Sequence, residues 1–341
     1  MTPSVFAKTV LSYPLAGLLR ATACFGNRMS ATILMYHRIL DPRSLRGLMQ
    51  EGMYVDVKTF ERQVEYLKRH YDVVSLETCL KTMRNREKPE RPFCCITFDD
   101  GWKDFYDNAF PVLKKHDAAA TVFLPTEFIG TDESFWTDRL GRIVVELEAR
   151  GRERVPADPA EPMIERISAL PGSMMERFET AIQMLKPLPA GRIRDINDNF
   201  FARLEITRDG SERSFLSWEE VRAMKESGAV RFGSHTRNHV ILTTVDDKTV
   251  YDELAESKGK LLKEGAVSES FIPFSYPNGD HTDRIADMVK SAGYNMALTT
   301  KRGRNRYMDG PVDVFRLERI GIHQDMTATD SMFSCRINGI F

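Results

Sequence analysis

Short apolar runs recur along the chain, and each ends at turn-forming or charged residues. Runs of this length and composition are typical of buried strands. By this criterion we expect strands at residues 31–36, 73–74, 93–96, 121–124, 230–233, 271–275, 296–299 and 314–322. Seven or eight short strands spread over the whole chain do not form one local hairpin, so the connections between them decide the fold class.

Most of these connections have the periodicity of amphipathic helices. Phe60, Val64 and Leu67 fall at i, i+4 and i+7 behind Asp56, which is a favourable N-cap. Ser217 and Glu220 form a capping box. Further helices are expected after Ser75 and at residues 105–116, 247–263 and 284–292. Strands that alternate with helices favour a parallel (β/α) barrel.

The alternation stops between residues 131 and 215. This segment is rich in Arg, Glu and Pro, has helical stretches at 138–150, 163–170 and 174–185, and has no convincing strand. We therefore expect a helical insertion at 131–215 within a barrel that spans 31–325. Residues 1–30 and 326–341 are assigned to an N-terminal amphipathic segment and a C-terminal tail.

Composition narrows the functional classes. The formal net charge of the 341 residues is -1, which removes any global electrostatic argument for nucleic acid binding. The five cysteines include no CxxC pair, so we expect free thiols in a reducing compartment. No apolar run approaches the roughly 18 residues of a membrane span. We expect a cytoplasmic protein whose N-terminus contacts the membrane surface, with export as the alternative because residues 21–24 resemble a signal cleavage site.

Asp99 and Asp100 follow the apolar run 93–96 after Thr97 and Phe98. Two carboxylates at the tip of a buried strand repel each other and lose solvation, so a positive group should lie between them. A divalent cation held by one Asp would leave the other free as a base. In the alternative interpretation, an Asp of this pair caps the following helix.

Other polar residues also follow predicted strands. His37, His235, His239, His323 and the turn 276–279 all lie there, and functional residues of a (β/α) barrel gather at the C-terminal strand ends. If residues 235–239 are helical, both rings of this HxxxH pair face one way and can hold one metal ion. Together with one Asp they form a catalytic type of site with open positions. Zinc is the first candidate, and cobalt, nickel or iron would fit the same nitrogen and oxygen ligands.

Such a site can hydrolyse an amide or ester. A water on the ion ionises near neutral pH, the second Asp takes its proton, and a nearby His protonates the leaving group. The ion and a backbone N–H near Tyr276, Pro277 and Asn278 would stabilise the oxyanion.

Three motifs resemble a known family, the polysaccharide deacetylases of the NodB-homology type, or carbohydrate esterase family four. The motifs are Thr97-Phe98-Asp99-Asp100-Gly101, His235-Thr236-Arg237-Asn238-His239 and Ser275-Tyr276-Pro277-Asn278-Gly279. The resemblance covers roughly residues 31–323. It implies a distorted (β/α) barrel, Asp99 as the general base, and Asp100, His235 and His239 as metal ligands.

The chain departs from the family pattern in the third motif, which usually begins with an Arg that orients the base. Ser275 occupies that position, and Arg319, or alternatively Arg316, could substitute. The opening Leu34-Met35-Tyr36-His37-Arg38 is most similar to the exopolysaccharide deacetylase branch, in which the catalytic acid comes from the first strand. That resemblance favours His37 as the acid and leaves His323 as the alternative.

The resemblance implies a metal-dependent hydrolase acting on carbon–nitrogen bonds other than peptide bonds. Its expected substrate is an N-acetylated amino sugar in a glycan, glycolipid or precursor. The alternatives are a hydrolase of non-sugar linear or cyclic amides and a glycan-binding homologue without activity. Trp102 and Trp218 could stack on a sugar, although packing in the core is the simpler interpretation. The basic run 301–306 could contact an anionic glycan or form a solvated loop.

Overall fold

The computed structural model describes residues 29–340 apart from 46, 51, 152–160 and 207–212. The chain divides into two compact units. Unit 1 takes its described residues from Met1–Asp41, Gly52–Thr131 and Ser214–Phe341, and unit 2 from Pro42–Glu51 and Asp132–Arg213. The predicted N-terminal amphipathic segment lies almost entirely outside the described residues.

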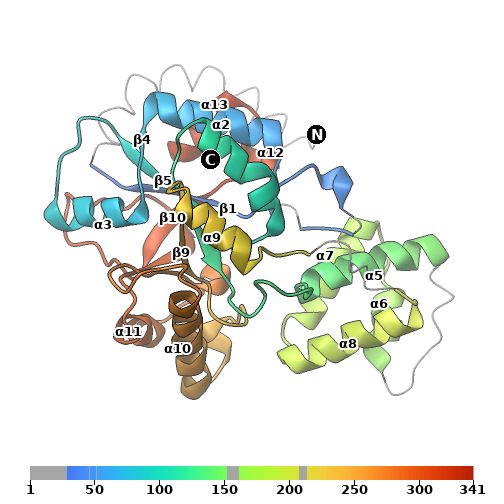
Figure 1. Ribbon diagram of the computed structural model, residues 1–341. Helices are drawn as coiled ribbons and strands as arrows, with labels where there is room; N and C mark the ends of the chain where they lie inside the picture. The colour runs from blue at the N-terminus through green and yellow to red at the C-terminus, as the bar shows by residue number, and fades with distance from the viewer. Residues whose placement is uncertain (1–28, 46, 51, 152–160, 207–212, 341) are drawn as a thin grey trace. The chain divides into compact units, whose positions relative to one another are not determined.

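Unit 1 is a closed parallel barrel (Figure 1). The ring runs β1–β10–β9–β8–β7–β6–β5 and closes where β5 pairs with β1. The short β4 (Asp72–Val73) adds to the start of β5. The ring strands are β1 (Thr32–Tyr36), β5 (Phe93–Phe98), β6 (Ala120–Leu124), β7 (Val230–Ser234), β8 (Pro273–Ser275), β9 (Met296–Arg302) and β10 (Leu317–Gly321). The (β/α) barrel expected from the sequence is confirmed.

Strand alternation separates the barrel core from the polar groups above it. All six residues of β5 are buried. Cys95 belongs to a hydrophobic cluster with Ile33, Phe123 and Leu298. Because side chains alternate along a strand, Cys95, Thr97 and residue 99 share one face of β5. Apolar side chains therefore fill the barrel at one level, and Asp99 enters it at the carboxyl end.

Most helices of unit 1 form where the apolar periodicity predicted them. In α2 (Val57–His70), Asp56 caps the first turn by accepting hydrogen bonds from the N–H groups of Lys58 and Thr59, and the Phe60 side chain is fully buried. The capping box at Ser217 opens α9 (Trp218–Glu226). The other helices are α3 (Leu76–Asn85), α4 (Phe110–Lys115) after a π-helical turn (Phe105–Ala109), α10 (Asp247–Lys263), α11 (Asp283–Ser291) and α12 (Gln324–Thr327).

The stretch assigned to a C-terminal tail contains another helix of unit 1. In α13 (Asp330–Ile337), Met332, Phe333 and Cys335 are buried. The Phe333 ring meets the Tyr66 ring of α2 edge to face, with centroids 5.6 Å apart. The short helix combines few residues with a weak apolar stripe, which is why sequence periodicity did not reveal it.

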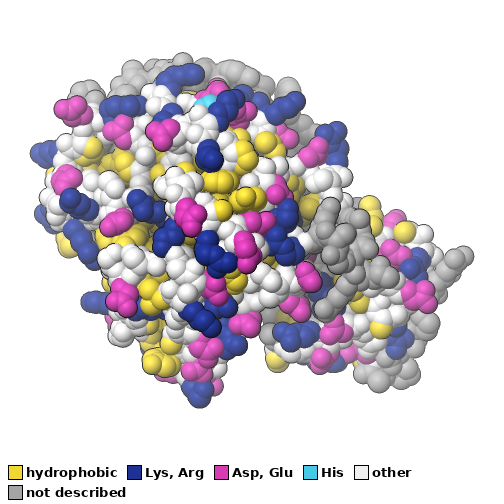
Figure 2. Space-filling view, in the orientation of Figure 1, with side chains coloured by type: hydrophobic (Ala, Val, Ile, Leu, Met, Phe, Trp, Pro, Cys, Tyr) yellow, Lys and Arg dark blue, Asp and Glu magenta, His cyan; other side chains and the backbone are white. Residues whose placement is uncertain are grey.

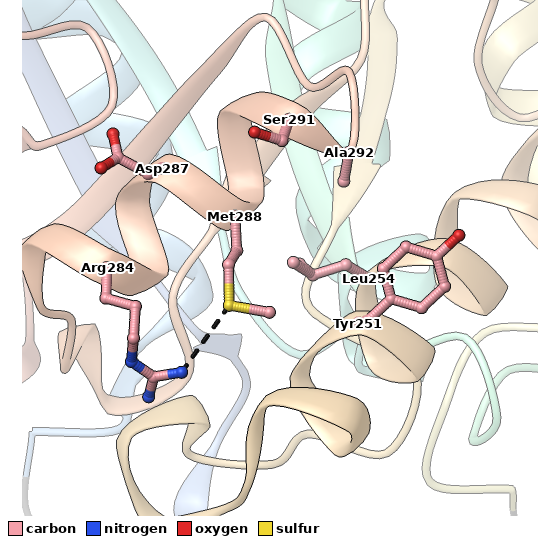
Figure 3. A pocket seen from close by; sticks show the side chains of 7 residues that line it. All are labelled: Tyr251, Leu254, Arg284, Asp287, Met288, Ser291 and Ala292. Atoms are coloured by element: carbon pink, nitrogen blue, oxygen red, sulfur yellow. Dashed lines mark hydrogen bonds between the residues drawn. The ribbon is translucent and has the colours of Figure 1, made fainter.

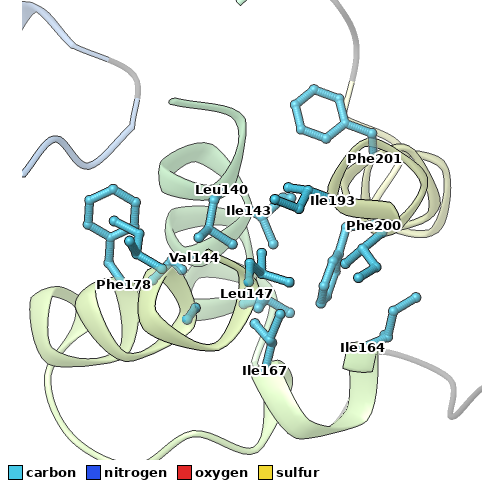
Figure 4. Packing of buried hydrophobic residues seen from close by; sticks show 14 of the residues in the cluster. Leu140, Ile143, Val144, Leu147, Ile164, Ile167, Phe178, Ile193, Phe200 and Phe201 are labelled. Carbon is cyan, nitrogen blue, oxygen red and sulfur yellow. The ribbon is translucent and has the colours of Figure 1, made fainter. Parts of the chain in front are cut away.

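Among its described residues, unit 2 has four α-helices and a hydrophobic core of its own (Figure 4). They are α5 (Trp136–Arg150), α6 (Pro162–Ser168), α7 (Met174–Leu185) and α8 (Ala190–Arg203), and α8 lies beyond the helices that the sequence predicted. The core side chains Leu147, Phe178 and Phe200 are at most 2% exposed. A buried cluster of this kind is the mark of an independently packed layer of helices.

The predictions about cysteines, membrane spans and charge can be compared with the described residues. Cys79, Cys94, Cys95 and Cys335 are buried free thiols, whereas Cys24 lies outside these residues. Within the part of the chain that the structure describes, no helix is long and apolar enough to cross a membrane. On the face drawn in Figure 2, basic and acidic side chains are interspersed, with no large patch of one sign.

Candidate metal centre and active site

Asp99 is held by a buried arginine. Arg319 is fully buried, and both terminal nitrogens of its guanidinium donate hydrogen bonds to the carboxylate. Nη1 lies 2.8 Å from Oδ1 and Nη2 lies 2.7 Å from Oδ2. Arg319 also donates to the Ser275 hydroxyl at 2.9 Å and to the Thr299 carbonyl oxygen at 2.8 Å. A bidentate arginine fixes both the position and the plane of a carboxylate.

This geometry decides between the two arginines considered from the sequence. The Arg316 guanidinium instead pairs with Asp283 at 2.8 Å and with Asp313 at 3.3 Å. Ser275, which occupies the usual arginine position, donates to Asp99 Oδ2 at 3.3 Å and accepts from Arg319. The positive charge beside Asp99 thus comes from β10, and the Ser275 hydroxyl bonds to both members of the pair.

Burial would raise the pKa of Asp99, but the Arg319 guanidinium and the neighbouring His235 more than offset it, so the pKa lies below its ordinary value. Asp99 is therefore ionised at neutral pH. Its Oδ2 accepts from Arg319 and Ser275, and its Oδ1 accepts from Arg319. Since a carboxylate oxygen has two lone pairs, Oδ1 keeps the capacity to accept a proton.

Asp100, His235 and His239 converge on one point. Asp100 Oδ1 lies 3.5 Å from His235 Nε2 and 3.2 Å from His239 Nε2. Asp100 has φ of 75°, a left-handed conformation, and the following Gly101 has φ of 65°. Because of this turn, the direction of the Asp100 side chain does not follow the strand alternation that places the Asp99 side chain. A Cβ at Gly101 would lie 2.8 Å from Leu124 Cδ2, so the tight turn requires glycine there.

The donor set fits a divalent metal ion. His235 Nδ1 lies 2.8 Å from the Ser275 carbonyl oxygen, which can only accept, so Nδ1 carries the proton and Nε2 presents its lone pair. One potential ligand atom from each of Asp100, His235 and His239 lies within 4.8 Å of the others. Acceptor atoms that face one another need a positive charge between them, and two histidines with one carboxylate suit zinc and similar ions.

The electrostatics of this group favour positive charge. Burial would raise the pKa of Asp100, but the imidazoles of His235 and His239 beside its Oδ1 hold the pKa well below its ordinary value. Burial would lower the pKa of His235, but Asp99 and Asp100 raise it above its ordinary value. The His239 side chain is 29% exposed whereas that of His235 is 3% exposed, so solvent reaches the group from the side of His239.

The segment 235–239 is not the helix that the HxxxH spacing suggested. Thr236 and His239 have φ of 63° and 56°, and the segment forms bends. Glu253 of α10, only 5% exposed, holds this loop. Its Oε2 accepts the N–H groups of Arg237 at 2.9 Å and Asn238 at 2.8 Å, and its Oε1 accepts the Asn238 amide at 2.7 Å. The buried carboxylate thereby brings His239 back beside His235.

Glu253 was not singled out from the sequence, although a signal exists. It lies among Val250, Leu254 and Leu261, which form the buried face of α10. An acidic residue on an apolar helix face needs partners, because a buried carboxylate is otherwise costly. Its partners here are the backbone of the loop that carries the histidines.

His37 follows β1, and the charges of the same cluster act on its imidazole. Burial lowers the pKa of His37, the charges of Asp100 and Asp99 raise it in part, and those of Arg319 and His235 lower it further. His323, the alternative acid, precedes α12, and its Nδ1 lies 2.5 Å from Asp325 Oδ1. Both histidines come from adjacent strand ends, since Met35 pairs with Gly321. The charges of Asp99 and Asp100 act on His37.

The turn after β8 limits the candidates for an oxyanion donor. The Tyr276 N–H is already bonded to the Leu298 carbonyl oxygen at 3.0 Å, and Pro277 has no N–H. Of the three residues considered, only Asn278 remains as a source of a backbone N–H. Asn278 has φ of 59°, and its carbonyl oxygen accepts from the Thr300 hydroxyl at 3.0 Å, which fixes the peptide that follows it. The buried Tyr276 instead supports the turn through its hydroxyl, which donates to the Phe315 carbonyl oxygen.

The basic run 301–306 and a second group of possible metal ligands make contacts within the chain. Lys301 pairs with Glu318 at 2.6 Å and Arg306 with Asp309 at 2.5 Å, so much of the basic run is used within the chain. A second group of possible metal ligands, Glu61, Glu65 and His116, already contains a cation, because the Lys115 ammonium lies 2.6 Å from Glu61.

The helices α10 and α11 border a hollow of about 560 Å³ (Figure 3). Its walls include Tyr251, Leu254 and Met288, and none of its lining residues belongs to the metal-ligand group. In Figure 3 the Arg284 side chain turns toward the Met288 sulfur. The hollow is therefore separate from the chemistry at the strand ends.

The chain resembles known deacetylases. A family model described as polysaccharide deacetylase matches residues 86–158 and 189–297. YxkH of Bacillus subtilis, assigned to the polysaccharide deacetylases, is 36% identical over 298 residues, which cover 87% of this chain and 73% of that protein. The poly-beta-1,6-N-acetyl-D-glucosamine N-deacetylase of Staphylococcus epidermidis is 38% identical over 111 residues, which cover 30% of this chain and 38% of that enzyme.

Solved structures show the same fold. The deacetylase PplD of Streptococcus pyogenes, determined in complex with acetate, superposes with a TM-score of 0.56 at 22% identity, covering 87% of this chain and 94% of that one. IcaB from Ammonifex degensii superposes with a TM-score of 0.56 at 16% identity, covering 89% and 97%. At these identities the likeness concerns the fold alone.

Proposed function

The chain belongs to the polysaccharide deacetylase family, and from this premise we propose that it is a metal-dependent hydrolase that removes the acetyl group from an N-acetylated amino sugar. The sugar would be part of a glycan, a glycolipid or a precursor. The partial match to the staphylococcal N-deacetylase supports an N-acetyl rather than an O-acetyl target.

One observation carries the proposal. An arginine-held carboxylate, Asp99, directly precedes Asp100, whose Oδ1 faces two histidine nitrogens. One carboxylate is thus neutralised and oriented within the protein, while the other contributes to a set of ligand atoms that needs a cation. A simple binding site for sugar would not require an ionised, unblocked carboxylate beside such a set.

Asp100, His235 and His239 would hold the ion. When bound, a divalent cation supplies a water of lowered pKa and positive charge for the carbonyl oxygen of the acetyl group. Asp99 would accept a proton from the attacking water through the second lone pair of Oδ1, and Arg319 would keep the carboxylate in place during the transfer. The Asn278 N–H is the backbone donor assigned to the developing oxyanion.

His37 protonates the departing amine. It lies close enough to Asp99 and Asp100 for their charges to act on its imidazole, and it comes from a different strand end than Asp99. Base and acid on different strands can flank a substrate from two sides. The amine leaves as the free amino sugar, and acetate is the other product.

Acetate release tests the proposal. Purified protein should release acetate from N-acetylglucosamine oligomers, lose this activity after treatment with a chelator, and regain it when Zn²⁺ is restored. The variants Asp99→Ala, Asp100→Ala and His239→Ala should each lack activity while keeping the far-ultraviolet circular dichroism of the wild type. Acetate release that persists unchanged in Asp100→Ala and His239→Ala would refute the site.

The substrate panel separates the proposed activity from other possibilities. Small cyclic and linear amides should not be hydrolysed at rates comparable to those of N-acetyl sugars. Hydrolysis of the amides alone would indicate an amidase unrelated to sugars. Glycan affinity without any turnover of a metal-loaded protein would indicate a binding protein.

A further inference from the structure

Trp102 makes a polar contact that packing alone does not explain. Its indole Nε1–H donates a hydrogen bond to Asp100 Oδ2 at 3.1 Å. The opposite oxygen of the same carboxylate, Oδ1, faces His235 and His239. The two oxygens of Asp100 thus have different neighbours, an N–H donor on one side and the imidazole nitrogens on the other.

The indole is held firmly in this orientation. Trp102 is 3% exposed, and its ring stacks on Phe215 with centroids 4.9 Å apart and an interplanar angle of 20°. The backbone around it is paired as well, because the Lys103 N–H donates to the Ser214 carbonyl oxygen and the Leu216 N–H donates to that of Gly101. Both the ring and its backbone therefore have fixed neighbours.

A charged pair also contacts the ring. The Arg38 guanidinium lies over the indole, 4.2 Å from the ring centroid. Asp104 holds this arginine through a 2.7 Å bond to Arg38 Nε and also accepts the Ile39 N–H at 2.9 Å. A cation against an aromatic face is stabilising and is worth more where the pair is shielded from water. The contacts link the end of β1 to Trp102 and, through it, to Asp100.

We propose that Trp102 is a positioning residue for the metal centre. Its indole N–H donates a hydrogen bond to Asp100 Oδ2, so that only Oδ1 is presented to the cation. The inference rests on the proposed function, since it assumes that Asp100 is a ligand. A carboxylate that binds through one oxygen uses one coordination position and leaves the others for the histidines, water and substrate. Outer donors of this kind commonly set the affinity of a metal site.

The burial of Trp102 argues against the sugar-stacking role considered from the sequence. A stacking platform must present an open ring face to the sugar. Here Phe215 and Arg38 both contact the indole, and the side chain has almost no exposed surface. The donor role accounts for both the burial and the direction of the N–H.

Trp102→Phe tests the inference because phenylalanine keeps an aromatic ring and removes the donor. Zn²⁺ affinity is measured on the metal-stripped full chain by competition with a chromophoric chelator. We expect Trp102→Phe to bind Zn²⁺ about 10–100-fold more weakly than the wild type. Trp218→Phe is the matched control, because Trp218 lies at the start of α9 and contacts Lys260. The control should bind like the wild type.

A spectroscopic measurement distinguishes positioning from simple packing. The visible absorption of the Co²⁺-loaded protein reports coordination geometry, and it should change in Trp102→Phe and stay unchanged in Trp218→Phe. A Zn²⁺ affinity within twofold of the wild type in a folded Trp102→Phe protein overturns the inference.

A wild-type measurement covers the case in which Trp102→Phe does not fold. The chain has three tryptophans, and with ¹⁵N-labelled indoles their resonances are assigned from Trp136→Phe and Trp218→Phe. The Trp102 indole proton should exchange slowly with solvent, and its resonance should move when Zn²⁺ is added. Rapid exchange with no response to Zn²⁺ would contradict the hydrogen bond.

The ligand variants separate this inference from the proposed function. If Asp100→Ala and His239→Ala lose Zn²⁺ binding while Trp102→Phe keeps it, the positioning role is wrong and the metal site stands. If all three variants bind Zn²⁺ like the wild type, the site itself is wrong, and the inference falls with it.

Discussion

Replacing Arg319 by methionine is the sharpest test of how the site is built. Methionine is unbranched and fills the space of the aliphatic part of the arginine, but it removes the charge and every donor. Asp99 would then keep Ser275 as its hydrogen-bond donor among the contacts described above. The change leaves a buried carboxylate without the cation that neutralises it.

The expected loss of stability follows from burial. Arg319 is fully buried and Asp99 is 2% exposed, so water cannot replace the lost partner without rearrangement. Breaking a buried ion pair by removing one member typically costs about 3–5 kcal/mol. We expect a loss of this size in the free energy of unfolding at neutral pH, where Asp99 is ionised.

Urea unfolding of the metal-free protein, followed by far-ultraviolet circular dichroism, measures this loss. Arg316→Met is the matched control, because Arg316 pairs with Asp283 and Asp313, whose side chains are 92% and 52% exposed. Exposed pairs contribute about 0–1 kcal/mol. The control should therefore unfold close to the wild type, with the same dependence on urea concentration.

A double variant isolates the pair. Asp99→Leu in the Arg319→Met background removes the unpaired charge together with its partner, so the double variant should be about 2 kcal/mol more stable than the sum of the two single losses predicts. Strict additivity, or a loss below about 1 kcal/mol in Arg319→Met, would show that the pair does not hold Asp99 in the way described.

Three further predictions concern separate parts of the molecule. His37→Gln should lower kcat about 10²–10⁴-fold in the acetate-release assay, whereas His323→Gln should change it only slightly; the reverse result would make His323 the acid. Glu253→Ala should weaken Zn²⁺ binding about 10–100-fold in chelator competition, because the loop that carries His239 loses its anchor. Asp252→Ala, which removes only a pair with Lys248 within the same helix, should not. Phe178→Ala should destabilise unit 2 by about 3–5 kcal/mol in urea unfolding and leave Zn²⁺ affinity unchanged. A loss of Zn²⁺ binding free energy of the same size would contradict the separation of the cores of the two units.

Much of the fold could be predicted because its signals are local. The buried strand β5 follows from a short apolar run, and α2 follows from Asp56 and the spacing of its apolar face. Chain order alone then favours a barrel, since strands joined by helices run parallel. The strand ends bring Asp99, Asp100 and His235 to one end of the barrel, so the composition of the site followed from the same pattern.

The sequence by itself therefore determined the strands of the barrel, most of the helices and the residue types that could meet at the carboxyl ends. Only the tertiary structure decided which of them touch. Arg319 rather than Arg316 reaches Asp99 because β10 delivers it into the barrel, 220 residues along the chain from its partner. The roles of Glu253 and Trp102 depend on left-handed turns at Asp100, Thr236 and His239. Such contacts arise from the direction of each side chain in three dimensions, and neither periodicity nor spacing along the chain contains that information.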